Sequence, residues 1–125
     1  MSKAERQEEV ERITAAITAA PHIYVTDFAG LNVAKVTEFR RRLRGAGAKY
    51  LVVKNTLAER ALEARGVTSL NEHLKGPTGL VLSTDPLSAA KVLTEFAKEN
   101  QKPGIRAGLV DGAPVSQAHI QRLGT

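Results

Sequence analysis

The order of secondary structure is clearest in the segment HIYVTDFAGLNVAKVTEFRRRLRGAGAKYLVV, residues 22–53. Its first part, residues 22–28, is rich in β-branched and aromatic side chains and predicts a strand. Asn32 is a suitable N-cap for a helix over residues 33–44, in which apolar side chains recur at helical spacing. Two glycines then end the helix, and KYLVV, residues 49–53, predicts a second strand.

The flanking sequence continues this alternation of helices and strands. The same criteria predict a first helix opened by a Ser2–Glu5 capping box and ended by Pro21, and a third helix capped by Asn55 over residues 56–65. They then predict a helical turn over residues 69–74, a strand over residues 78–83, and a helix started by Asp85–Pro86. A strand over residues 105–110 follows, then an Asp111–Gly112 hairpin turn with an extended piece near Val115, and a last helix opened by Ser116.

This alternation predicts one α/β fold. It favours strands joined by helical crossovers within one sheet. We predict an α/β (α+β two-layer) sandwich with helices packed on a mixed four- to five-stranded sheet. A length of 125 residues fits a single domain over residues 1–125. The last predicted helix is barely two turns long at Thr125, so we expect the sequence to be a piece of a longer protein.

Composition excludes several classes of function. Cysteine is absent, which excludes disulfides, thiolate metal sites and a cysteine nucleophile. The N-terminal segment MSKAERQEEVER does not have the pattern of a signal peptide, and no stretch approaches the roughly 18 apolar residues of a membrane span. We therefore expect a soluble, cytoplasmic protein that does not bind a membrane.

No arrangement of residues indicates catalysis. The histidines at 22, 73 and 119 share no metal-ligand spacing, and the chain contains neither a phosphate-binding loop nor a nucleophile elbow. Asp27, at a strand end, has no evident acid or base partner. We predict no catalytic residue, no metal and no cofactor, and hence a protein that is not an enzyme.

The positive charge is confined to one block of the sequence. Seven Lys and Arg residues and a single Glu lie between Lys35 and Lys54, a net charge of +6, whereas the whole chain carries +5. Like charges on adjacent helical turns repel each other, and a bound polyanion would relieve that repulsion. A merely solvated basic face remains the alternative.

The geometry of this block favours phosphate contacts. Arg40 and Arg44 are four residues apart and share one helix face, with Arg41 one step round. Guanidinium groups suit bidentate phosphate binding. Lys54 and Asn55 precede a predicted helix start, where free N–H groups attract anions.

Thr56 and Arg60 extend this second region along the third helix. For Asn55, simple capping is the alternative to RNA contact, and for Arg60 a pair with Glu59 or Glu63 is. An RNP-type aromatic motif is absent, so contacts to the phosphates and shape of structured RNA fit better than base stacking on a sheet.

Two long segments resemble the bacterial ribosomal protein L-ten family. They are FAGLNVAKVTEFRRRLRGAGAKYLVVKNTLAERAL, residues 28–62, and HLKGPTGLVLSTDPLSAAKVLTEFAKENQKPGIRAGLVDG, residues 73–112. The pieces VVKNTLAERAL and LKGPTGLVLS are the most specific. Archaeal and eukaryotic stalk proteins and a related assembly factor share VKNTL-like segments, but the DP…KVL.EFAKEN stretch favours the bacterial branch.

The resemblance implies a function in the large ribosomal subunit. It implies an α-β plait similar to the ferredoxin-like fold, which binds the GTPase-associated region of large-subunit rRNA beside ribosomal protein L-eleven and forms the base of the stalk that recruits translation GTPases. In a full-length chain, a C-terminal helix absent from this sequence would carry the acidic stalk dimers. The predicted RNA-binding residues are Arg40, Arg41, Arg44, Lys54, Asn55, Thr56, Arg60, Gly30 and Lys3.

Two alternatives remain open. A ribosome-assembly factor would occupy the same rRNA site but would lack the stalk-binding helix. A small enzyme acting on a phosphate ligand would use Lys54 and the helix start at Asn55 and would need a deep pocket there.

Overall fold

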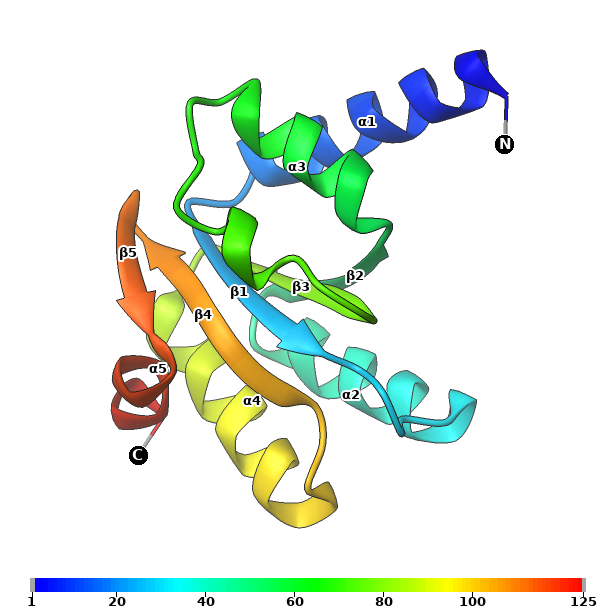
Figure 1. Ribbon diagram of the computed structural model, residues 1–125. Helices are drawn as coiled ribbons and strands as arrows, with labels where there is room; N and C mark the ends of the chain where they lie inside the picture. Colours follow the sequence, from blue (N-terminus) through cyan, green and yellow to red (C-terminus); the bar gives the residue numbers. More distant parts are fainter. Residues whose placement is uncertain (1, 125) are drawn as a thin grey trace.

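Helices and strands alternate through residues 2–124, which the computed structural model describes (Figure 1). The elements are α1 (Lys3–Thr18), β1 (His22–Asp27), α2 (Val33–Gly45), β2 (Ala48–Val53), α3 (Asn55–Glu63), the 3-10 turn η1 (Asn71–His73), β3 (Thr78–Ser83), α4 (Pro86–Asn100), β4 (Gly104–Val110), β5 (Ala113–Ser116) and α5 (Gln117–Leu123).

The sheet has the strand order β2-β3-β1-β4-β5, and every pairing is antiparallel. β1 and β2 flank β3, so they run in the same direction, and α2 connects them across it. β3 and β4 flank β1 in the same way and are connected by α4. This split β-α-β arrangement is the ferredoxin-like topology. The predicted α/β class and the plait are therefore confirmed.

The prediction of a mixed sheet is wrong, because every pairing of strands is antiparallel. A helical crossover does join strands of the same direction, as expected, but a third strand is inserted between them and pairs antiparallel with both. The insertion depends on contacts between segments distant in sequence, and hydrophobic periodicity carries no information about it.

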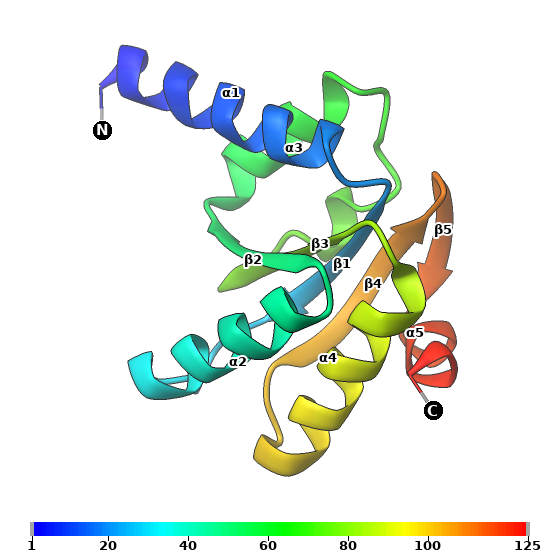
Figure 2. The same cartoon turned by 180° about the vertical axis from the view of Figure 1, so that it is seen from behind.

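Helices cover both faces of the sheet, so the expected two layers describe only one face (Figure 2). On that face, α2, α4 and α5 enclose a core around Phe39, Leu93 and Phe96. On the other face, α1 and α3 enclose a second core that includes Ile17 and Leu57. Alternate side chains of the strands point to opposite faces, which explains how one sheet serves both cores.

Most predicted helix starts are confirmed by their caps. The Ser2–Glu5 capping box is present, and the side chains of Asn32, Asp85 and Ser116 accept hydrogen bonds from backbone N–H groups in the first turn of α2, α4 and α5. The prediction for α3 was wrong. Lys54 occupies its N-cap position, and the Asn55 side chain instead donates a hydrogen bond to the Gly76 carbonyl oxygen, at 3.0 Å.

The predicted hairpin between β4 and β5 is also confirmed. Asp111 and Gly112 both have positive φ, +53° and +79°, and they connect the paired residues Val110 and Ala113. This conformation matches a two-residue turn whose twist fits the flanking strands, and it explains the preference for Asp-Gly at this point.

The close approach of β4 to β1 requires glycine at position 108, which gives a first testable prediction. A Cβ added to Gly108 would lie 2.5 Å from the Ile23 carbonyl oxygen. We expect Gly108→Ala to lower the free energy of unfolding by about 1–3 kcal/mol, because backbone must move to admit the methyl group. Urea unfolding followed by circular dichroism measures the change. Gly45→Ala is the matched control, since its Cβ would meet nothing within 4 Å. Equal stability of the two variants would contradict the prediction.

Candidate nucleic-acid interface

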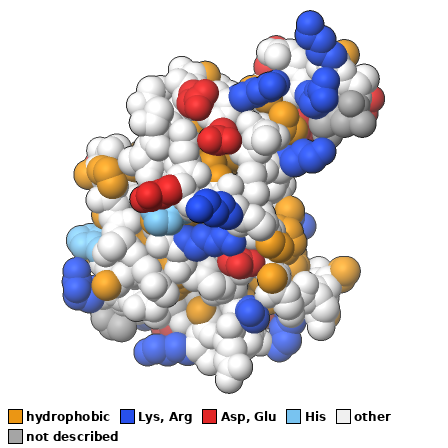
Figure 3. All heavy atoms as spheres, in the orientation of Figure 1, with side chains coloured by type: hydrophobic (Ala, Val, Ile, Leu, Met, Phe, Trp, Pro, Cys, Tyr) orange, Lys and Arg blue, Asp and Glu red, His pale blue; other side chains and the backbone are white. Residues whose placement is uncertain are grey.

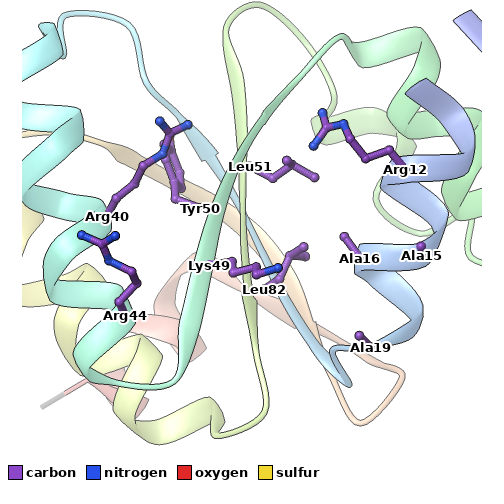
Figure 4. Close-up of a pocket in the computed structure, with 10 residues that line it drawn as sticks. All are labelled: Arg12, Ala15, Ala16, Ala19, Arg40, Arg44, Lys49, Tyr50, Leu51 and Leu82. Atoms are coloured by element: carbon purple, nitrogen blue, oxygen red, sulfur yellow. The ribbon is translucent and has the colours of Figure 1, made fainter. Parts of the chain in front are cut away.

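The outer strand β2 lies at the base of an open cleft between helices that cover opposite faces of the sheet. The C-terminal half of α1 forms one wall and the C-terminal half of α2 the other, around a volume of about 560 Å³ (Figure 4). We call it the edge cleft. Its lining residues are Arg12, Ala15, Ala16, Ala19, Arg40, Arg44, Lys49, Tyr50, Leu51 and Leu82.

Three cations at the edge cleft have no acidic partner. Arg40 and Arg44 extend from α2, and Lys49 comes from β2 (Figure 4). All three are exposed, and within residues 2–124 no ion pair involves any of them. The predicted shared face of Arg40 and Arg44 is thus present, and the fold adds a third cation to it.

The other arginines of the block are neutralised by carboxylates. Glu38 accepts from Arg41 Nη2 at 2.5 Å and from Arg42 Nε at 3.2 Å, and Arg42 Nη1 donates to Glu99 at 2.7 Å. The hydrogen bonds from Arg41 and Arg42 lower the pKa of Glu38 to about 2, so this carboxylate is ionised at neutral pH. In the C-terminal half of α2, the unpaired charges therefore lie on the face that borders the edge cleft, whereas Lys35, in the first turn, donates to the Asn100 side chain.

Tyr50 supports the α2 side of the edge cleft. The guanidinium carbon of Arg40 lies 6.0 Å from the centre of the Tyr50 ring. The Thr26 hydroxyl donates to the Gly79 carbonyl at 2.9 Å, so its oxygen is available to the Tyr50 hydroxyl at 3.2 Å. Burial raises the pKa of Tyr50 above its ordinary value, which keeps the phenol neutral at physiological pH. The buried Tyr50 ring therefore lies beside the Arg40 guanidinium at the wall of the edge cleft.

A second basic region lies where β2 leads into α3. Lys54 is exposed at a helix start that lacks a side-chain cap, so first-turn N–H groups remain available to an anion. The hydrogen bond from Asn55 to the Gly76 carbonyl holds this start against the loop that carries exposed Lys75. Two segments that are 21 residues apart in the sequence thus meet at one end of the sheet.

The remaining predicted contact residues are more dispersed. Thr56 and Arg60 are exposed on α3, and no ion pair of Arg60 with Glu59 or Glu63 occurs among the described residues. Gly30 lies in the turn before α2, where its added Cβ would meet the Lys102 side chain. Lys3 opens α1, roughly 14 Å along the helix from the residues that line the edge cleft. The structure does not bring these residues to the edge cleft.

Sequence reasoning omitted two cations of the edge cleft. Lys49 belonged to the basic block, and the period-2 alternation of β2 could have placed it beside Leu51, on the face opposite Tyr50. Arg12 offered no such signal, because α1 meets the edge cleft only through the tertiary fold. Its guanidinium is already hydrogen-bonded to Glu9, with Nε to Oε2 at 3.1 Å.

Asp27, the one carboxylate considered for catalysis, is engaged in structural contacts. It accepts from the Ala29 backbone N–H at 2.9 Å and from Arg106 Nη2 at 2.9 Å. The Ala29 hydrogen bond, and after it Arg106, lowers the pKa of Asp27. Across residues 2–124 there is no group of three or more acidic, His or Cys side chains suited to a metal ion.

The surface view shows basic groups over α1 and at the middle of the same face (Figure 3). The outline is indented between α1 and the body of the molecule below it.

None of the helices in the described part of the chain combines the length and apolarity needed to cross a bilayer.

The fold and the edge cleft together define a basic α-β plait with a cationic groove beside its outer strand. A model of the family described as "Ribosomal protein L10" matches residues 1–98. The chain belongs to the ribosomal protein L10 family.

Several curated relatives are similar over most of the chain. "Large ribosomal subunit protein uL10" from Shouchella clausii is 44% identical over 109 residues, which cover 86% of this chain and 66% of that protein. Proteins of the same name from Staphylococcus saprophyticus and Geobacter sp. are 39% and 42% identical and are covered to 72% of their length, over 96% and 98% of this chain. The chain therefore spans slightly under two thirds of the first relative and somewhat more of the others.

Proposed function

We propose that the chain is a non-catalytic structural component of the large ribosomal subunit that binds the GTPase-associated region of large-subunit rRNA. The observation that carries this proposal is the cluster of Arg40, Arg44 and Lys49 at the edge cleft, which no carboxylate of residues 2–124 neutralises. Three exposed cations on one surface attract a polyanion. Because the chain belongs to a ribosomal protein family, we take that polyanion to be RNA.

The second basic region supports a wider footprint on RNA. Lys54 at the start of α3 and the neighbouring Lys75 lie at one end of the sheet, held together by Asn55 and Gly76. We assign Thr56 and Arg60 to the same region, and Gly30, Lys3 and Arg41 remain predicted contacts. In this arrangement, residues 1–125 form the N-terminal rRNA-binding domain of the stalk base in the cytoplasmic ribosome.

The partners follow from the same proposal. Ribosomal protein L11 would lie nearby on the rRNA, and the acidic stalk dimers would bind to a C-terminal helix of a full-length chain. The enzyme alternative would use Lys54 and the helix start at Asn55 and would need a deep pocket there, and the Asn55 side-chain N–H is already engaged with the Gly76 carbonyl oxygen. The assembly-factor alternative predicts the same contacts, but the relatives from Shouchella clausii, Staphylococcus saprophyticus and Geobacter sp. carry the name of a ribosomal subunit protein.

Binding to the isolated GTPase-associated rRNA fragment tests the proposal. We expect selective binding over an unrelated structured RNA of equal length, measured by fluorescence anisotropy across a salt series. The logarithm of the association constant should fall with the logarithm of salt concentration with a slope of about −3 or steeper, because the three cations of the edge cleft contact phosphates and the second basic region adds further contacts. Equal affinity for both RNAs would reduce the edge cleft to a generic basic surface. Absence of binding at low salt would refute the proposed function.

A further inference from the structure

The edge cleft has an apolar interior that phosphate contacts alone do not require. Below its cationic rim, Ala16 of α1 and Ala19, the residue that follows α1, face Leu51 of β2 and Leu82 of β3 (Figure 4). Alanine carries nothing beyond Cβ, so the space between the helices stays open, and about 560 Å³ falls in the usual range of small-ligand clefts. The backbone of an RNA duplex would touch the rim and leave this interior unfilled.

We infer that the edge cleft accepts one unpaired nucleotide of the bound RNA, with its base against the apolar interior and its phosphates on Arg44 and Lys49. This inference rests on the proposed function and specifies what the RNA must present. Proteins recognise unpaired bases by holding them against apolar, aromatic or guanidinium surfaces, and Arg40 beside the Tyr50 ring supplies such a surface at the cleft wall.

The charges at the rim favour RNA over a peptide. β2 is an outer strand, and an extended peptide could in principle add to its free edge. Lys49 on that edge works against strand addition, as lysine does on exposed sheet edges. The three cations have no carboxylate partner in the described part of the chain, and they complement consecutive phosphates, which repeat along a nucleic-acid chain whatever its sequence.

The test compares two RNA hairpins of equal length that differ in one feature. One has a single unpaired 2-aminopurine in its stem, and the other is fully paired. We expect about tenfold tighter binding to the first RNA, with a rise in 2-aminopurine fluorescence as the base leaves its stacked neighbours. Ala16→Leu should fill the cleft and abolish both the preference and the fluorescence change, while binding to the paired RNA stays unchanged.

Two further variants make the test specific. Ala19→Leu fills the same cleft from another position and should act like Ala16→Leu, which guards against a folding defect in either variant. Ala4→Leu makes the same change at an exposed site on α1 away from the cleft and should behave as the unmodified chain. Circular dichroism verifies the fold of each.

The outcomes separate this inference from the proposed function. The nucleotide site is overturned if the chain binds the rRNA fragment but shows no preference between the two hairpins. It is also overturned if the preference survives both cleft-filling variants. In either case the proposed function stands. Poly-glutamate serves as the probe for an acidic peptide. If Ala16→Leu abolishes poly-glutamate binding and leaves the RNA affinities unchanged, the cleft is a peptide groove and the inference is overturned. Failure to bind any RNA refutes both.

Discussion

Replacement of both Arg40 and Arg44 by Ala should lower the affinity for the GTPase-associated rRNA fragment about a hundredfold at low salt. Each guanidinium is exposed at the edge cleft and has no acidic partner among the described residues, so each is available to donate charge-assisted hydrogen bonds to phosphate. Such bonds contribute about 1.5 kcal/mol each, or about tenfold in affinity. The slope of the logarithm of affinity against that of salt should become shallower by about two. Fluorescence anisotropy over a salt series measures both quantities.

The single variant Lys91→Ala is the control, because it removes one positive charge as either arginine replacement does. Lys91 lies on α4, away from the edge cleft. We expect this control to change the affinity less than threefold, about the size of a weak, screened surface contribution. An unchanged affinity of the double variant, with its unfolding midpoint preserved, would show that the site is assigned to the wrong residues.

Phe39→Ala should lower the free energy of unfolding by about 3–5 kcal/mol, which is the cost of removing a fully buried aromatic side chain. Phe39 is completely buried on the inner face of α2. Its ring centre lies 4.9 Å from that of Tyr50, in an edge-on arrangement, and 4.8 Å from that of Phe96. The loss would remove a packing centre that links α2 to the sheet and to α4.

Urea denaturation measures the loss, and Val33→Ala serves as the control on the same helix. Val33 is 84% exposed, so its truncation should change the stability by no more than about 0.5 kcal/mol. A change of less than about 1 kcal/mol for Phe39→Ala would mean that the core collapses around the missing ring. Because Phe39 packs against Tyr50, whose ring lies beside Arg40, we also expect weaker RNA binding per folded molecule.

Local signals in the sequence were sufficient for the elements and for part of the site. Asn32, Asp85 and Ser116 cap helices as predicted, since a cap depends on a side chain and the backbone two or three residues ahead. Arg40 and Arg44 share a face because the helical repeat requires it. The prediction for Asn55 failed because the competing acceptor, the Gly76 carbonyl, lies on another segment.

The sequence by itself determined the alternation of elements, the confinement of positive charge to one block and the family to which the chain belongs. Each of these depends on residues close together in the chain or on their identity. Only the tertiary structure decided the insertion of β3 between β1 and β2, the second helical layer, and the meeting of α1 with α2 across the edge of β2. These features arise when apolar faces of distant segments are buried together, so the edge cleft exists only once both cores have formed.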